Sequence, residues 1–262
     1  MLFFSPSYIF VVLLPTIAIT GWAAWRVRSA YGKWSRVDSG IDRDPLDFAR
    51  YLLDRQGLNN VRVEAIPGQL TDHYDPRGPV LRVSSTVAGR AGGGPMGSGM
   101  ESGIGLGRNG FGQPTGFPAP PVRRLSVAQA AVIAHEVGHA LQDKQHDPAM
   151  AVRQAIVPVA QLGSGIAPWL ILAGLIFHVT GLALVGLVFF AGAVAFTFAT
   201  LPVEFGASNR ALALVGQFGM YGDRQQGARE VLRAAGWTYV AGALTALLTF
   251  LYYLSLFTGR RN

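Results

Sequence analysis

The sequence predicts a membrane protein that combines a small α+β domain with about four transmembrane helices. Only 14% of its 262 residues are charged, against roughly 25% in an ordinary soluble domain. Half of the residues are hydrophobic, mean hydropathy is +0.31, and the apolar residues gather into long uncharged blocks. The chain has no cysteine, which excludes disulfide scaffolds, thiolate zinc sites and cysteine nucleophiles.

The uncharged blocks predict transmembrane spans near 3–25, 156–177, 180–202 and 237–257. The first span is expected to be a retained anchor, because no basic residue precedes it and its apolar stretch is longer than that of a signal peptide. The middle two are expected to form a hairpin that turns at His178. The chain then divides into an anchor (1–25), an α+β domain (26–153), a transmembrane hairpin (154–203), a polar helix (204–236) and a last transmembrane helix (237–262).

The basic residues predict the orientation in the membrane. Four spans place both termini on one face and both polar regions on the other. Those regions hold 20 of the 22 Lys and Arg residues, so the positive-inside rule places them in the cytoplasm. We interpret the net charge of +7 as topology and contact with lipid headgroups, and we expect no nucleic-acid partner because no such binding motif is present. Twenty Arg against two Lys are typical of a GC-rich bacterial genome.

Local signals predict the elements of the α+β domain. Asp44-Pro45 is typical of a helix start and Gly57 of a helix end, which predicts a helix over 45–56. Alternating apolar residues in 61–66 and 80–85 predict two strands, joined as a hairpin or a three-stranded meander. The tract 89–122 is so rich in Gly that we expect a flexible loop.

The strongest chemical signal lies on the next predicted helix, 126–143. It carries the sequence HEVGH, in which His135 and His139 are four residues apart and therefore share one helix face. Both imidazoles can then reach one zinc ion at about 2.0–2.1 Å, while Glu136 stands beside the metal as a general base toward water. Gly138 weakens the helix without an evident packing gain, which argues against histidines that merely pack.

A catalytic zinc needs a third protein ligand and an open fourth position. Past His139 the chain has only two glutamates, Glu204 and Glu230. Glu204 follows the third span at the membrane face of the HEVGH helix, so we expect it to be the ligand. The alternative is a carboxylate that pairs with Arg210 or caps a helix. Glu230 has arginines around it and is expected on a solvated face.

Several segments in succession resemble the YugP-type family of membrane-bound neutral zinc metallopeptidases. They are YGKWSRV (31–37), LTDHYDPR (70–77), AAVIAHEVGHALQ (130–142), LPVEFGASNRALA (201–213) and GAREVLRAAGWTYVAGAL (227–244). The resemblance implies a gluzincin-like minimal zinc-protease domain interrupted by a membrane hairpin. It also implies one zinc ion on His135, His139 and Glu204, with Glu136 as catalytic base. The chain departs from the family at Gly206, where Asp or Asn is usual, and in the long tract 89–122.

Further candidates surround this core. His73 lies between two acids, which is more typical of a turn residue than of a catalytic donor. A strand at 80–84 could hold a peptide substrate by edge pairing. Tyr74, Asn209 and Tyr221 are candidates for stabilising an oxyanion.

We therefore expect a multi-pass zinc metallopeptidase of the cell membrane, an endopeptidase that cleaves peptide or protein substrates at the cytoplasmic face. Two alternatives stay open. One is a catalytically silent membrane scaffold or chaperone that keeps the zinc site. The other is an intramembrane-cleaving metalloprotease. Against it, only about ten apolar residues precede His135, and the motif is followed by the polar residues Gln142, Asp143 and Lys144.

Overall fold

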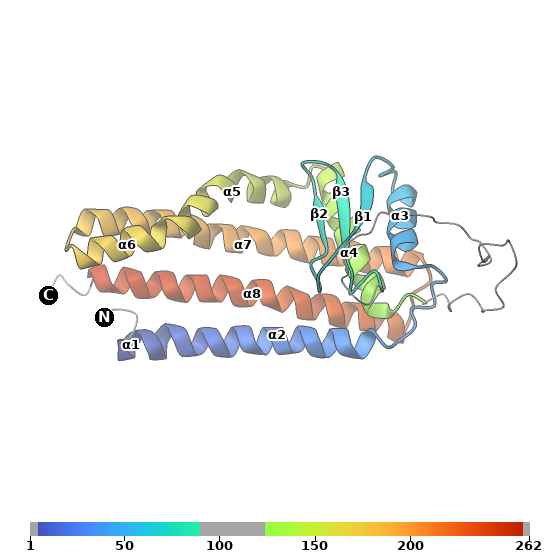
Figure 1. Ribbon diagram of the computed structural model, residues 1–262, viewed down its shortest axis with the longest axis horizontal. Coiled ribbons are helices and arrows are strands. Elements are labelled where there is room, and N and C mark those ends of the chain that lie inside the picture. The colour runs from blue at the N-terminus through green and yellow to red at the C-terminus, as the bar shows by residue number, and fades with distance from the viewer. Residues whose placement is uncertain (1–4, 90–123, 259–262) are drawn as a thin grey trace, which may run out of the picture.

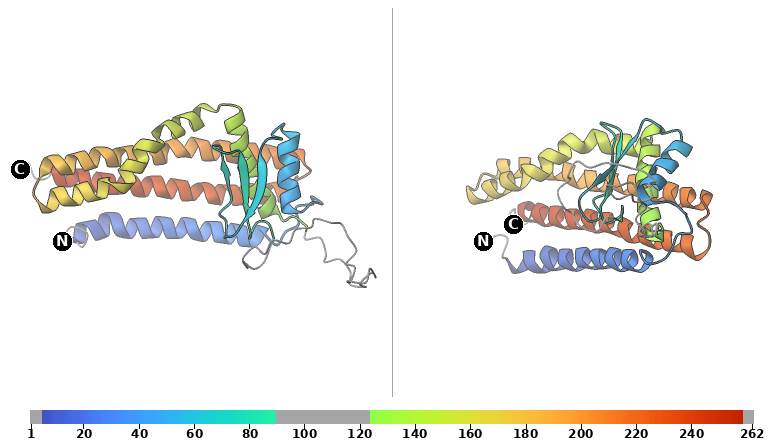
Figure 2. Two further views of the ribbon diagram at one scale, coloured as in Figure 1. Left: turned by 45° about the horizontal axis from the view of Figure 1, so that its top comes forward. Right: turned by 45° about the vertical axis from the view of Figure 1, so that its right-hand side comes forward.

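The computed structural model describes residues 5–89 and 124–258. Long helices lie side by side, and a small sheet with α3 and α4 gathers at one end of them (Figures 1 and 2). The start of α1 and the end of α8 lie at the opposite end. The Gly-rich loop predicted at 89–122 falls, apart from Gly89, outside the described residues.

Within residues 5–89 and 124–258, four helical segments are long and apolar enough to cross a membrane, as the sequence predicts: Pro6–Trp34, Pro148–Ile176, Thr180–Gln217 and Asp223–Thr258. The first consists of α1 (Pro6–Tyr8), a π-helical turn (Ile9–Leu13) and α2 (Leu14–Trp34). It packs along α8 (Asp223–Thr258), where the Trp34 indole N–H donates to Glu230 Oε2 at 2.9 Å. Glu230 also pairs with Lys33 at 3.0 Å, so this carboxylate joins two helices rather than facing solvent alone.

The expected helix at 45–56 is confirmed as α3 (Pro45–Arg55), capped by the Asp44 carboxylate. The sheet differs from the expectation. It contains β1 (Arg62–Ile66), β2 (His73–Asp75) and β3 (Val80–Ser84) in the order β1-β3-β2.

Strand β3 is central in this sheet, so the predicted hairpin or meander of 61–66 and 80–85 is wrong. β1 runs parallel to β3, and β2 pairs with β3 in antiparallel orientation. The physical reason is that the turn-rich segment after Ile66 carries the chain past the sheet centre and supplies a strand of its own. Strand 80–84 therefore has a neighbour on each side, and the substrate-binding edge expected there is wrong; the edges are β1 and β2.

Helix α4 (Val127–Lys144) confirms the helix expected at 126–143. The Ser126 side chain accepts from the Gln129 N–H while the Gln129 side chain accepts from the Ser126 N–H, as a capping box does. α4 lies between the sheet and α3 on one side and the long helices on the other (Figure 2). Phe48, Leu81 and Ile133 are almost completely buried in the core that results.

The hairpin turns at His178, as expected, and this residue has a positive φ of 56°. Its first arm is α5 (Pro148–Gly165) followed by α6 (Ala167–Ile176), and both pack on α7 (Thr180–Gln217). α7 continues through Pro202, so the expected span at 180–202 and the segment that begins at Glu204 belong to one helix. α8 likewise joins the segment before 237 to the last span.

Candidate metal centre

The candidate centre forms where α4 crosses α7. Gly138 of α4 packs directly against the backbone of Ala207, three residues after Glu204. No side chain separates the helices at this point, so the imidazoles of α4 reach the carboxylate of α7. Gly138 therefore has the packing role that its sequence context did not reveal.

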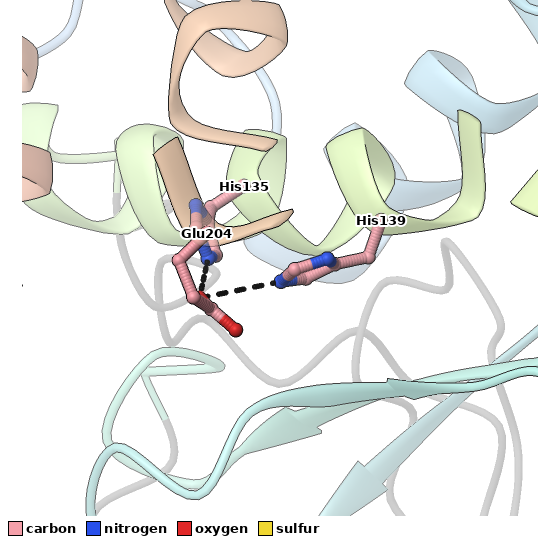
Figure 3. A group of neighbouring side chains, drawn as sticks. All are labelled: His135, His139 and Glu204. Atoms are coloured by element: carbon pink, nitrogen blue, oxygen red, sulfur yellow. Dashed lines mark hydrogen bonds and ion pairs between the residues drawn. The ribbon is translucent and has the colours of Figure 1, made fainter. Parts of the chain in front are cut away.

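His135, His139 and Glu204 converge on one point (Figure 3). Glu204 Oε2 lies 3.3 Å from His135 Nε2 and 3.6 Å from His139 Nε2. The three ligand atoms all lie within 4.8 Å of one another. Two atoms bound to a tetrahedral zinc at about 2.0–2.1 Å are about 3.4 Å apart, so two imidazoles and a carboxylate in this arrangement fit a catalytic zinc.

A second layer of polar groups orients both imidazoles. The Gln142 amide N–H donates to the Val203 carbonyl at 2.9 Å, so its oxygen faces His139 Nδ1 at 3.0 Å and accepts from it. Ser208 Oγ lies 3.3 Å from His135 Nδ1. The Gln142 oxygen can only accept, so His139 carries its proton on Nδ1 and directs its Nε2 lone pair to the candidate metal position; Ser208 holds the ring of His135 in place.

Glu136 is held beside this position by the sheet. Its Oε2 accepts the Tyr74 backbone N–H at 3.0 Å, which ties the glutamate to the outer side of β2. The Tyr74 hydroxyl donates to Asp143 Oδ2 at 2.8 Å, so the same residue joins β2 to the end of α4. Burial, followed by Asp143, raises the pKa of Tyr74.

The centre is rich in negative charge. Burial raises the pKa of Asp72, the Glu136 charge adds to this rise, and hydrogen bonds from Ser84 oppose it. Burial lowers the pKa of His139, but the contacts with Glu204 and the charge of Glu136 outweigh burial, so the net pKa is raised. A cation bound between these groups would offset this charge.

A cleft of about 840 Å³ opens beside the centre. Glu136, His139 and Glu204 line it together with β2, the inner face of α5 and Tyr239 of α8. Tyr239 and Glu204 therefore face the same cavity. The volume lies within the range of small-molecule and peptide sites.

Of the other candidates from the sequence, two line the cleft and two do not. His73 and Tyr74 line the cleft. The His73 ring donates from Nδ1 to the Thr71 carbonyl at 2.9 Å and accepts at Nε2 from Arg82 at 3.2 Å, so both ring nitrogens are engaged. Asn209 and Tyr221 are exposed and are not among the cleft residues.

Arg210 pairs with Asp147 at 2.8 Å, so the alternative pairing with Glu204 is not seen in the described structure.

The sequence did not reveal four residues of the site. Gln142 and Ser208 contact the histidines, and Tyr239 and Arg153 line the cleft. Gln142 lies three residues after His139 and Ser208 four residues after Glu204, so helical spacing from the ligands could have found both. Tyr239 and Arg153 come from other helices and carry no such signal.

Comparisons with known proteins identify the family of this chain. The sequence model of a family described as "putative neutral zinc metallopeptidase" matches residues 9–92 and 120–258. The intervening part of the Gly-rich tract is outside the match. No solved structure matches the chain.

A curated relative from Bacillus subtilis (strain 168), named "Putative membrane protease YugP", is 35% identical over 251 residues. The alignment covers 94% of this chain and 96% of the relative. Together with the converging His135, His139 and Glu204, these matches show that the chain belongs to the "putative neutral zinc metallopeptidase" family.

Proposed function

We propose that the protein is a membrane zinc endopeptidase with a gluzincin-like site that holds one zinc ion. The observation that carries the proposal is the convergence of His135, His139 and Glu204. Two of them, His139 and Glu204, line one cleft with Glu136. Three protein ligands with a free fourth position are typical of catalytic rather than structural zinc.

Glu136 is the general base of this proposal. The Tyr74 N–H fixes its carboxylate at the cleft, where it can take a proton from water and return it to the leaving amine. A bound zinc ion would lower the pKa of that water and polarise the substrate carbonyl. Gln142 keeps His139 in the tautomer that metal binding needs, and Ser208 holds the ring of His135 in place.

Strand β2 replaces strand 80–84 as the proposed substrate-binding edge. It is an edge strand, it lines the cleft, and its outer side faces Glu136. An extended peptide could lie along this edge, where Glu136 accepts the Tyr74 N–H, and place its scissile bond beside the zinc ligands. The Tyr239 hydroxyl is the proposed donor for an oxyanion, since Tyr239 lines the cleft together with Glu204.

The proposed location is the cytoplasmic face of the cell membrane. The basic residues concentrate in the polar regions, and the sheet with α3 and α4 gathers at one end of the long helices (Figure 1). The cleft is lined by charged residues such as Asp75, Arg77 and Asp143, which favours cleavage of segments outside the hydrocarbon core.

The test combines metal analysis with proteolysis of casein by the full-length protein in detergent. We expect about one zinc per chain in the wild type. Glu136→Gln should keep the zinc and lose cleavage, because it removes the base and leaves the ligands. Glu204→Ala should lose both.

Other outcomes would favour the alternatives. A zinc-loaded wild type that cleaves no peptide or protein substrate would support a silent scaffold. Cleavage confined to transmembrane substrates in proteoliposomes would support an intramembrane protease.

A further inference from the structure

Arg153 of α5 brings a positive charge to the cleft. It lines the cleft together with Glu136 and His139. Its Nε is buried without a hydrogen-bond partner, and within residues 5–89 and 124–258 its guanidinium forms no ion pair. Its Cζ lies over the Phe196 ring, 5.8 Å from the centroid. Because a guanidinium does not lose its proton in proteins, this charge is permanent.

Within the described residues, none of the acids that line the cleft forms an ion pair with Arg153, and each has another partner. Asp72 is held by Ser84, Asp75 by Arg77 and Arg82, Glu136 by the Tyr74 N–H, Asp143 by the Tyr74 hydroxyl, and Glu204 by His135 and His139. A partly buried guanidinium without a direct hydrogen-bonding anion is unfavourable, so its position in the cleft favours a role toward a ligand.

Arg153 belongs to the inward face of α5. Met150 and Val157, three residues before and four after it, line the same cleft. Val152 and Val159 lie on the other face of the helix, with 53% and 46% of their surface exposed. Because lipid would contact the valine face, the guanidinium is better placed for a ligand in the cleft than for a lipid headgroup.

Arg153 also acts close to the metal centre. Together with Glu204 and Tyr239 it lines the cleft. We propose, on the basis of the peptidase function proposed above, that Arg153 binds a carboxylate of the peptide substrate beside the bond that is cut. A planar guanidinium can bind both carboxylate oxygens through parallel hydrogen bonds. The carboxylate belongs either to an acidic side chain or to the C-terminus of the substrate.

Four matched fluorogenic peptides test the proposal with the full-length protein in nanodiscs of neutral lipid. They carry either Glu or Gln near the scissile bond and end in either a free carboxylate or an amide. We expect the wild type to prefer one carboxylate source by at least about tenfold in kcat/KM, as for a charge-assisted hydrogen bond. Arg153→Gln should abolish this preference, and Arg153→Lys should restore part of it. The exposed Arg229→Gln is the matched control and should keep it.

A binding measurement separates this proposal from the peptidase function. Calorimetric titration of the same peptides into Glu136→Gln should show a preference for the carboxylate peptide. The double variant with Arg153→Gln should lose that preference while zinc content and the melting temperature stay unchanged. If the wild type cleaves none of the peptides but binding still depends on Arg153, the carboxylate subsite stands and the peptidase function fails.

Two results would overturn the carboxylate subsite. One is an equal loss of cleavage or binding for all four peptides in Arg153→Gln, which would indicate a structural role. The other is an effect of Arg153→Gln that appears only when the nanodiscs contain anionic phosphatidylglycerol, which would identify a lipid phosphate as the ligand.

Discussion

A Cβ atom placed on Gly138 would lie 2.6 Å from the carbonyl oxygen of Ala207. Real Cβ atoms do not approach a backbone oxygen so closely, so the absent side chain allows α4 and α7 to cross at this distance. His139 and Glu204 lie within one helical turn of the contact on their respective helices. The glycine of the HEVGH motif therefore sets the distance between the ligand-bearing helices.

Gly138→Ala should weaken the centre by separating α4 from α7. We expect a loss of about 1–3 kcal/mol in the free energy of unfolding, as in other overpacked cores, together with weaker zinc binding. Gly242→Ala in α8 is the matched control, since a Cβ there would meet no atom within 4 Å. Denaturation in detergent and zinc titration measure both effects. Equal behaviour of the two variants would contradict the role of Gly138.

Glu204→Gln should reduce zinc occupancy strongly, because it removes the anionic ligand from a set of three. Glu230→Gln should keep full occupancy, since Glu230 is bound to Lys33 and Trp34. Metal analysis after dialysis against a weak chelator distinguishes the two variants. Loss of zinc in both, or in neither, would argue against Glu204 as the third ligand.

Gln142→Leu should lower zinc affinity by about 10- to 100-fold, the usual effect of losing a hydrogen bond to a metal-bound histidine. The variant removes the acceptor of His139 Nδ1 and leaves the Val203 carbonyl without its donor. Competition with a fluorescent chelator measures the affinity. The exposed Gln226→Leu provides the comparison and should leave the affinity unchanged.

Asp147 should make stability depend on pH in the acid range. Burial tends to raise the pKa of its carboxyl, but the N–H groups of the α5 start and the Arg210 guanidinium outweigh burial and hold the pKa below 3.8. The ionised form therefore stabilises the folded state at pH values above the ordinary pKa. This contribution is lost as the pH falls through the lowered pKa.

Asp147→Asn should accordingly melt at a lower temperature than the wild type at pH 7. The difference should shrink as the pH falls below about 4. Melting curves of the detergent-solubilised protein between pH 3 and 7 provide the measurement, and Asp42→Asn, at an exposed site, is the control. A difference that grows toward low pH would contradict the assignment.

Tyr239→Phe should lower kcat by about 10-fold or more while zinc content stays constant, if its hydroxyl stabilises the oxyanion. Tyr221→Phe should have no effect, because Tyr221 has 67% of its surface exposed and does not line the cleft. Steady-state kinetics on a single peptide compare the two. A change in KM alone would indicate that Tyr239 contributes only to substrate binding.

The membrane helices and the HEVGH helix could be predicted from the sequence because their signals are local. Uncharged blocks identify spans, and the capping residues Asp44 and Ser126 mark helix starts within one residue. The candidate ligand Glu204 could be predicted because few glutamates follow the motif and because the hairpin returns the chain to the membrane face of the HEVGH helix.

The sheet order could not be predicted, because alternation identifies strands without saying which strands pair. A three-residue strand at His73–Asp75 lies in a segment whose Gly, Pro and Asp residues indicate turns. The cleft residues Arg153 and Tyr239 were missed for a related reason. Their proximity to Glu204 depends on how α5 and α8 pack against α7, and such contacts between distant segments leave no periodic signal.

Because α7 is one continuous helix, the position of the candidate metal centre along the bilayer normal depends on the thickness of the bilayer. Glu204 lies about 24 residues after the start of this helix, which corresponds to about 36 Å, whereas a hydrocarbon core is about 30 Å thick. No loop between span and ligand can absorb a mismatch. The continuous helix therefore couples the position of Glu204 along the bilayer normal to the thickness of the membrane, and a thicker membrane would draw the same residues toward its surface.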